Sequence, residues 1–303
     1  MSGPEPSWPS VSVVIPTRDR PELLQETLAA IRGQDYPGVL GAIVVFDRSA
    51  PDQAIGSDDT LRPVRAIANS RTPGAAGARN SGAVAADTEL VAFCDDTDLW
   101  LPGKMLAQAA VLTDFPEAEV VCCGLRLFGP DLEIDRSIPL TQVTFRQLLG
   151  GHMPQLHPSG IVVRRSAGLL FDEEIPGSYG EDYEFLLRAS ARTPVRNLQL
   201  IGVGIRWHKG SYFSVLQNAP LISSAVQWLL PRYDFTRAGF AHWAGKVAFA
   251  EAVQKNRAAA LTWSARTMLR RPLDARALLA VVVALGVPPS FIMKVLDRLG
   301  RGV

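Results

Sequence analysis

The chain has 303 residues, of which 47% are hydrophobic and 20% charged, so it can bury a large core in one or two domains. Its 31 basic and 30 acidic residues give a formal charge of +1, which argues against a general nucleic-acid-binding protein. That sum conceals an asymmetry, because ten basic and three acidic residues lie from Lys246 onward and give that segment a net charge of +7. The basic tail predicts an anionic neighbour, and a membrane surface or a nucleic acid would qualify.

Three further observations limit the classes of protein to which this chain can belong. Residues 1–10 are rich in Pro and Ser and lack the basic and apolar regions of a signal peptide, so we expect a short disordered lead. The odd number of cysteines (Cys94, Cys122 and Cys123) favours reduced core thiols in a cytosolic protein. The most apolar run, residues 277–287, has only 11 residues, whereas a bilayer span needs roughly 20. We expect that run to form a buried or interfacial helix.

The first elements alternate between strand and helix. Val11–Ile15 is a β-branched run closed by Pro16 and predicts a parallel strand that is buried on both faces. A helix is expected to open with Pro21 in its first turn and to break at Gly33. A second buried strand is predicted over residues 42–46.

The alternation continues through most of the chain and then gives way to helices. The further predicted elements are helices over residues 75–86, 104–112 and 180–192 and strands over residues 89–94, 119–128, 161–164 and 198–205. From Ala219 onward the pattern is helical and is broken at Pro231, Pro272 and Pro288. This order predicts an α/β fold with a mostly parallel central sheet, flanking helices and a C-terminal helical region. The expected domains are residues 11–217 and 218–303, after the lead 1–10.

An acidic cluster follows one predicted strand directly. Leu90–Cys94 runs into Asp95, Asp96 and Asp98, and three carboxylates this close repel one another unless a cation or another positive group offsets their charge. Hard oxygen ligands suit Mg²⁺ or Mn²⁺, which commonly bridge to nucleotide phosphates. The alternative is a polar turn whose aspartates cap the helix that begins near Pro102.

Other polar groups are expected at the same edge of the sheet, where the parallel strands end. Thr17, Arg18 and Asp19 follow the first strand and Asp47 follows the second. The Gly-rich segment 73–82 would let a phosphate approach backbone N–H groups, with Arg79 as a forked cation. Alternatively, the small residues of that segment serve close helix packing and Arg79 is solvated.

Two later motifs add candidates for acid–base chemistry. Glu181 and Asp182 lie in the first turn of a predicted helix, where either could act as a general base or simply complement the helix dipole. His208 has a polar, basic setting and could contact a metal or a phosphate, although a single histidine is more often structural. His152 and His157 share a loop from which either could reach a substrate.

In order and spacing these motifs resemble the bacterial family 2 glycosyltransferases of GT-A fold, over about residues 10 to 214. The resemblance is carried by the segments Val11–Thr17, Gln34–Pro37, Phe46-Asp47, Ala78–Gly82, Phe93–Pro102 and Glu181-Asp182, and by His208. Two positions depart from the family pattern. Phe46 stands where the first base-contacting acid is usual, and Thr97 stands where an acid often touches the metal.

The resemblance implies a role for each matched residue. Asp182 would be the catalytic base and Glu181 would orient the acceptor. Nucleotide contacts would come from Pro16, Thr17, Arg18, Asp47, Arg79, Asn80, Asp95 and Asp96, with Asp47 reading the base. Metal ligands would be Asp96, Asp98 and His208, for Mn²⁺ or Mg²⁺, although Thr97 would weaken such a site because it offers only a neutral oxygen.

The function implied is that of an inverting, hexosyltransferase-type enzyme. It would move a sugar from a nucleotide-diphosphate donor, with uridine as the expected base, to a hydroxyl of a glycan or a lipid-linked sugar in cell-envelope or polysaccharide biosynthesis. The rival functions are a nucleotidyltransferase and a non-catalytic sugar-nucleotide-binding or scaffold protein.

We expect a cytoplasmic protein without a nucleic-acid partner. Its basic C-terminal helices would suit peripheral contact with the inner face of the cell membrane. Alternatively, those helices pack on the catalytic domain or form a homodimer.

Overall fold

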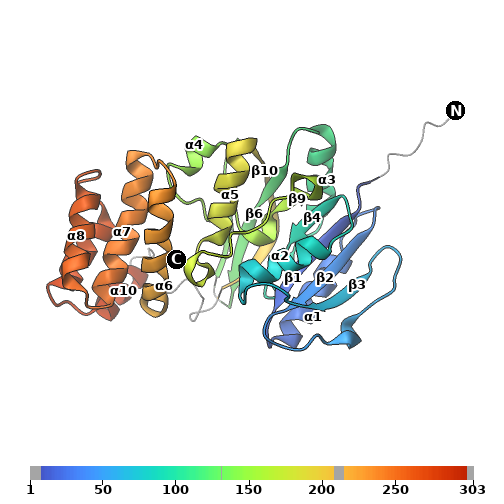
Figure 1. Ribbon diagram of the computed structural model, residues 1–303, viewed down its shortest axis with the longest axis horizontal. Coiled ribbons are helices and arrows are strands. Elements are labelled where there is room, and N and C mark those ends of the chain that lie inside the picture. Colours follow the sequence, from blue (N-terminus) through green and yellow to red (C-terminus); the bar gives the residue numbers. More distant parts are fainter. Residues whose placement is uncertain (1–7, 131, 208–214, 299–303) are drawn as a thin grey trace. The chain divides into compact units, whose positions relative to one another are not determined.

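The computed structural model describes residues 8–130, 132–207 and 215–298, and the chain divides into two compact units (Figure 1). The first, here called the sheet unit, comprises the chain up to residue 145, residues 153–173, and the chain from residue 181 to the end of the last strand. The second, the helical unit, comprises residues 146–152, residues 174–180 and the C-terminal helices. Two short segments from the middle of the sequence therefore belong with the helices.

One ten-stranded sheet forms the centre of the sheet unit. Its strands are β1 (Val11–Thr17), β2 (Leu40–Phe46), β3 (Val64–Ala68), β4 (Leu90–Phe93), β5 (Leu99–Trp100), β6 (Val120–Gly129), β7 (Leu132–Arg136), β8 (Gln142–Val143), β9 (Val162–Arg164) and β10 (Val195–Arg206). They lie in the order β3-β2-β1-β4-β9-β6-β10-β5, with β7 paired to β6 and β8 paired to β10.

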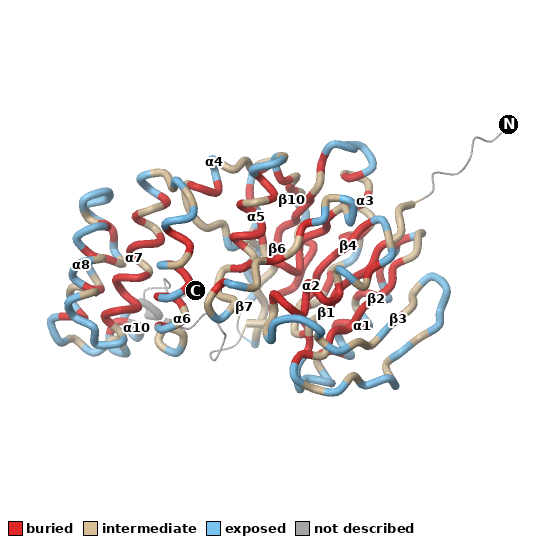
Figure 2. Tube along the Cα trace, in the orientation of Figure 1, coloured by how far each residue is buried: buried red, intermediate tan, exposed pale blue. Residues whose placement is uncertain are grey.

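The expected α/β architecture with a mostly parallel central sheet is confirmed. The β1–β2, β1–β4, β2–β3 and β6–β10 pairs are parallel. The short strand β9 lies between β4 and β6 and is antiparallel to both. Figure 2 shows β1, β2 and β4 largely buried, whereas β3 at the sheet edge is mostly half-buried or exposed. The weak apolar pattern of β3 explains why the sequence did not predict it.

Helices cover both faces of this sheet. They are α1 (Pro21–Arg32), α2 (Ala75–Ala85), α3 (Lys104–Asp114) and α5 (Glu181–Arg192), and the short α4 (Phe145–Leu148) leads into the helical unit. Short 3₁₀ turns occur at Gln53–Ile55, Pro158–Gly160, Arg165–Ala167, Pro176–Ser178 and Leu230–Arg232.

Alternation along β1 sends its side chains to opposite layers. Val13 and Ile15 pack in the core cluster that includes Leu28 of α1 and Met105 of α3. Val14 faces α2, and a methyl group placed on Gly82 of α2 would lie only 2.3 Å from Val14 Cγ1. The glycine therefore lets α2 approach the sheet closely, which brings the start of this helix to the ends of β1 and β2.

The helical unit contains α6 (Val215–Leu229), α7 (Arg237–Val253), α8 (Arg257–Met268), α9 (Ala275–Ala284) and α10 (Pro289–Arg298). The expected C-terminal helical region is confirmed, and the chain breaks its helices at the three predicted prolines. A further break, between α7 and α8 at residues 254–256, contains no proline and was not predicted. Small side chains make its core, which includes Ala248, Ala252, Ala260 and Ala280. Among the described residues, no helix combines the length and the hydropathy that crossing a bilayer requires.

Candidate active site

The ends of the parallel strands gather the polar residues that the sequence singled out. Thr17 ends β1, and its carbonyl oxygen accepts a hydrogen bond of 2.9 Å from the backbone N–H of Asp47, just after β2. The acidic cluster follows β4, which lies on the other side of β1. The ends of β1 and β2 are thus joined by a backbone hydrogen bond, and the end of β4 is joined to them through side chains.

Asp96 makes that side-chain connection. Thr17 Oγ1 donates to Asp96 Oδ2 over 2.8 Å, and Arg20 Nη1 donates to Asp96 Oδ1 over 2.9 Å. Burial raises the pKa of Asp96 above its ordinary value even though both partners favour the ionised form. Both oxygens of the carboxylate are engaged within the protein, so Asp96 holds the loop after β1 against the acidic cluster.

Asp98 is more deeply enclosed than its neighbours. Ser159 Oγ donates to Asp98 Oδ2 over 2.5 Å, and His157 Nδ1 lies 3.5 Å from the same oxygen. Burial raises the pKa of Asp98 to about 7, with the negative charge of Asp95 adding to the effect while His157 opposes it. The backbone N–H of Asp95 donates to Ser159 Oγ over 3.0 Å, so one serine bridges both ends of the cluster.

Asp95, Asp98 and His157 bring one ligand atom each to within 4.8 Å of one another. His157 Nδ1, which lies 3.5 Å from Asp98 Oδ2, accepts a hydrogen bond of 3.3 Å from the backbone N–H of Ser159, and a metal ligated by this nitrogen would take the place of that bond. Carboxylate oxygens and imidazole nitrogens are both ligand types that bind divalent transition-metal ions. The donor set therefore fits a divalent cation such as Mn²⁺.

The metal ligands expected from the sequence were Asp96, Asp98 and His208. The structure places Asp98 in the group just described and Asp96 on Thr17 and Arg20. His208 lies outside the described residues. Thr97 Oγ1 is 3.4 Å from Asp98 Oδ1, so the neutral oxygen at this position lies beside the acidic group.

Arg79 joins the cluster to helix α5. It extends from α2, is only 3% exposed, and donates to Asp95 Oδ1 from Nη2 and to Glu181 Oε1 from Nη1, both over 2.7 Å. Its guanidinium also lies over the ring of Phe171, 5.2 Å from the centroid. Although burial opposes its charge, the two carboxylates hold the pKa of Arg79 above its ordinary value. The interpretation of Arg79 as a solvated surface residue is thereby excluded.

The two acids at the start of α5 differ in their surroundings. Burial raises the pKa of Glu181 to about 7, against the opposing charge of Arg79 and with the charge of Asp182 adding to the rise. Asp182 is half-buried, and its Oδ1 accepts a hydrogen bond of 2.8 Å from the backbone N–H of Tyr183. Glu181 is thus committed to Arg79, whereas Asp182 is the more accessible carboxyl group.

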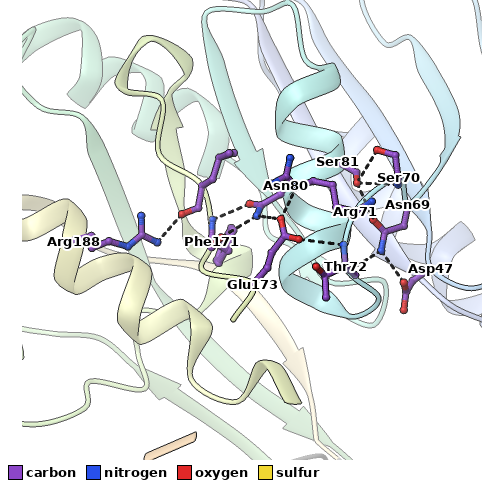
Figure 3. Close-up of polar contacts among 11 residues, drawn as sticks. Asp47, Asn69, Ser70, Arg71, Thr72, Asn80, Ser81, Phe171, Glu173 and Arg188 are labelled. Carbon is purple, nitrogen blue, oxygen red and sulfur yellow. Dashed lines mark hydrogen bonds and ion pairs between the residues drawn. The ribbon is translucent and has the colours of Figure 1, made fainter. Parts of the chain in front are cut away.

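Asp47 anchors the loop that precedes α2 (Figure 3). Asn69 Nδ2 donates to Asp47 Oδ1 over 2.8 Å, and the backbone N–H of Gly74 donates to Oδ2 over 3.1 Å. Gly74 has a φ of +121°, a conformation that glycine adopts readily, which lets the chain turn into the helix there. Asp47 therefore fixes the position of the 69–74 loop in addition to any contact with a nucleotide base.

Glu173 holds the same loop from the other side. The backbone N–H of Thr72 donates to it over 3.1 Å, Asn80 Nδ2 over 2.7 Å, and Arg71 forms an ion pair with it (Figure 3). Although burial opposes ionisation, these hydrogen bonds lower the pKa of Glu173 to about 2. Asn80 also exchanges two hydrogen bonds with the backbone of Phe171, of 2.9 and 2.8 Å, so its side-chain amide is engaged inside the protein.

A pocket of about 160 Å³ lies beside the tips of β1 and β2 and is lined by Thr17, Arg20, Phe46 and Ser49, among others. Pro16 precedes it within β1, and Arg18 is exposed and lies 3.7 Å from Asp19. Phe46, at a position where the family usually has an acid, thus contributes an apolar wall.

Sequence reasoning did not single out Ser159, Glu173 or Arg20, and it noted His157 only as a loop residue. Each of these acts on a partner that is distant in the sequence, such as Ser159 on Asp98 and Glu173 on Asn80. The cue that was present is the polar run His157-Pro158-Ser159 before a short apolar strand.

The mostly parallel sheet, with carboxylates and an arginine gathered at its strand ends, has the GT-A-like α/β fold, and the family match below identifies a glycosyltransferase. The chain belongs to glycosyl transferase family 2, whose model matches residues 12–168.

Solved structures with a similar fold include TarS from S. aureus and a mannosyltransferase. Residues 1–349 of TarS from S. aureus, in complex with UDP-GlcNAc, are 18% identical to this chain with a TM-score of 0.55, and the match covers 94% of this chain and 92% of that one. The mannosyltransferase PcManGT from Pyrobaculum calidifontis, in complex with GDP-Man and Mn²⁺, is 20% identical with a TM-score of 0.54 and coverages of 95% and 84%. At these identities the likeness concerns the fold.

Among curated proteins, the uncharacterized protein y4gI of Sinorhizobium fredii is 28% identical over 141 residues. That match covers 44% of this chain and spans only 15% of the relative's length.

Proposed function

We propose that this glycosyltransferase moves a hexose from a nucleotide-diphosphate donor to a hydroxyl acceptor with inversion at the anomeric carbon. The observation that carries the proposal is Arg79, a buried guanidinium held by Asp95 on one side and Glu181 on the other. A cation fixed in this way is preorganised to stabilise negative charge that develops on a departing diphosphate. It also connects the predicted donor residues to the predicted catalytic helix.

The donor nucleotide would lie across the strand ends. Asp47 would receive the base, and Pro16, Thr17 and Arg18 would line its approach beside the pocket near Phe46. Asp95, Asp96, Arg79 and Asn80 contribute through the network already described. Because Asp96 and Asn80 have both ends of their side chains engaged in the protein, we assign them to holding the loops that contact the nucleotide. UDP is the expected nucleotide.

Asp182 would take the proton from the acceptor's hydroxyl group. As it does so, the oxygen of that hydroxyl bonds to the anomeric carbon of the donor sugar, and the bond between that carbon and the diphosphate oxygen breaks. The choice of Asp182 over Glu181 rests on accessibility, since Glu181 is buried against Arg79. Glu181 would keep the guanidinium and the start of α5 in place.

Asp95, Asp98 and His157 are the residues we propose to hold Mn²⁺ or Mg²⁺, with Asp96 and His208 remaining predictions from the sequence. A bound cation would supply additional positive charge for the diphosphate. A weaker site than usual for the family is expected because Thr97 is neutral.

The acceptor class is proposed to be a glycan or a lipid-linked sugar in cell-envelope or polysaccharide biosynthesis, reached from the cytoplasm at the inner face of the membrane. The mixed composition of the C-terminal helices, basic and apolar together, supports that location.

The test begins with donor use. Purified protein is incubated with UDP-GlcNAc, UDP-glucose and GDP-mannose, with and without Mn²⁺, and the release of nucleoside diphosphate is measured. Release from one donor that falls at least 100-fold in Asp182→Asn, with unchanged nucleotide binding by calorimetry, supports the assignment. Near-normal turnover in that variant would remove Asp182 from the role of base. In a parallel incubation with a nucleoside triphosphate and a sugar 1-phosphate, release of pyrophosphate would identify a nucleotidyltransferase instead.

A further inference from the structure

Exposed large apolar side chains concentrate in the helical unit. Of the thirteen that the described part of the chain exposes, eight lie between residues 261 and 295. They are Leu261, Leu269, Leu273, Leu278, Val282, Leu285, Phe291 and Val295. The most exposed are Leu273 at 84%, Leu285 at 78% and Leu269 at 74%. Single exposed leucines are ordinary, but a concentration of this kind marks a surface that meets something apolar.

The spacing along α9 shows that three of these eight residues share one face of that helix. Leu278, Val282 and Leu285 follow one another at intervals of four and three residues and are all exposed. The opposite side of α9 is buried in the core of the unit through Ala280 and Val283. The helix is therefore apolar on its outer face as well as on its inner face, which packing within the unit does not require.

The charges around these residues have one sign. Residues 257–295 contain Arg257, Arg266, Arg270, Arg271, Arg276 and Lys294, and Asp274 is the only acid among them. Asp274 is 3% exposed, and its carboxylate accepts from the backbone N–H groups of Arg276 and Ala277 at the start of α9. It also lies 3.8 Å from Arg276 Nη1 and 4.0 Å from Arg271 Nη1. This segment thus exposes five cations and no carboxylate.

Two of the arginines lie over aromatic rings. Arg266 lies over Trp263 at 4.7 Å and Arg270 over Phe240 at 3.8 Å, measured from the guanidinium carbon to the ring centroid. Both arginines are exposed, so each offers an apolar stem beside its ring and a charged end to the solvent.

We infer that this surface, here called the basic leucine face and consisting of the eight exposed apolar residues and the five exposed cations, docks on an anionic lipid bilayer. Leucines enter the headgroup boundary while arginines and Lys294 meet lipid phosphates. A second copy of the same face would bring like charges together, which disfavours self-association through it. The inference deepens the proposed location and rests on the proposed function only for the acceptor's presence at the membrane.

The test is sedimentation of the full chain with vesicles of phosphatidylcholine alone or with roughly 30% phosphatidylglycerol, at about 0.1 M and 0.5 M salt. We expect at least tenfold tighter binding to the anionic vesicles, weakened at the higher salt. The double variant Leu269→Ser/Leu273→Ser should lose about tenfold in affinity. Its matched control is Leu61→Ser/Val84→Ser, which replaces residues of the sheet unit that are 50% and 64% exposed and should bind as the wild type does.

Circular dichroism and UDP binding of each variant show whether it is folded. Equal binding to both vesicle types, or no effect of the leucine substitutions in a folded variant, would overturn the inference. A dimer that forms without vesicles and is lost in the same double variant would assign the face to a second copy instead. The assay contains no donor and no acceptor. A lack of vesicle binding would therefore not count against the proposed glycosyl transfer, and a lack of transfer would not count against vesicle binding.

Discussion

Single side chains in the acidic cluster differ in what their ionisation costs. Asp95 has the Arg79 guanidinium as a partner, and although burial opposes ionisation this charge keeps its pKa low. Asp98 has neighbours that are neutral or negative apart from His157, and its pKa is raised to about 7 by burial. A residue that is costly to ionise in this way gains the most from a bound cation.

The benefit that Asp98 gains from a bound cation should appear as a pH dependence of metal affinity. Mn²⁺ binds only the ionised carboxylate, so its affinity should rise about tenfold between pH 6 and pH 8 as a group with a pKa of about 7 loses its proton. Calorimetric titration of Mn²⁺ at several pH values measures this. Asp98→Asn should abolish binding, and His157→Ala should weaken it. Asp96→Asn is the matched control and should retain binding, whereas loss in that variant would favour the ligand set expected from the sequence.

Lys104 is a second residue whose charged form is disfavoured by burial. It is fully buried, its Nζ has no hydrogen-bond partner among the described residues, and the ammonium lies 3.6 Å from the centroid of the Trp100 ring. Burial lowers its pKa to about 8, against the favourable effect of the three nearby thiols. Between pH 8 and 10.5 the unfolded chain would keep a proton that the folded protein has lost, so this group makes stability rise with pH there.

Lys104→Met should therefore raise the free energy of unfolding at pH 7 by about 2 kcal/mol, since it removes a buried charge and keeps the volume. Urea unfolding at pH 7 and pH 9.5 measures both proteins. The advantage of the variant should shrink at the higher pH, and comparing the two proteins cancels the contribution of the buried cysteines. A less stable variant at pH 7 would show that the contact with Trp100 outweighs desolvation.

At the scale of elements, the loop between β3 and α2 is held from both ends. Asp47 fixes Asn69 and Gly74, and Glu173 fixes Arg71, Thr72 and Asn80 (Figure 3). Loops at the carboxyl ends of parallel strands are where ligands commonly bind, so a loop held in this way would present its backbone to the proposed donor in one conformation.

Glu173→Gln should loosen this loop because a neutral amide cannot replace the charge on which Arg71 and the Thr72 N–H converge. We expect the KM for the donor to rise about fivefold to tenfold with kcat changed less than twofold, since Glu173 positions the loop and touches no reacting atom. Steady-state kinetics measures KM and kcat separately for the variant and the wild type. The control Glu117→Gln removes an exposed carboxylate paired with Arg196 and should leave both constants unchanged. A fall in kcat alone would contradict the positioning role.

At the scale of the whole molecule, the two proposed functional surfaces belong to different compact units. The proposed donor residues lie in the sheet unit, whereas the basic leucine face lies in the helical unit. The charge of the sequence is also distributed unevenly, because the excess of basic residues lies in the C-terminal helices.

Each ligand should therefore protect its own unit from hydrogen exchange. UDP with Mn²⁺ should slow exchange in peptides covering residues 17–20, 69–80 and 95–98 and leave residues 257–295 unchanged. Anionic vesicles should do the reverse. Mass spectrometry of both complexes measures this, and protection of the helical unit by the nucleotide alone would show that the two surfaces are coupled.

The sequence by itself determined the buried strands, the main helices and the family, but not the edge strand β3 or the short strands β5, β7 and β8. Strands such as β1 and helices such as α1 were readable because burial periodicity, prolines and glycines act over a few residues. The motifs that follow these strands carried the resemblance that the family match confirms. The acidic cluster and Arg79 were recognised as candidates on the same local grounds.

Only the tertiary structure decided which side chains meet. Arg79 reaches Glu181 across 102 positions of the sequence, and Thr17 reaches Asp96 across 79. The antiparallel insertion of β9 and the approach of His157 to Asp98 likewise depend on the order of strands in the sheet. Hydrogen bonds and ion pairs act over a few ångströms in space, whatever the separation along the chain, so local patterns predict the partners available but not the pairs that form.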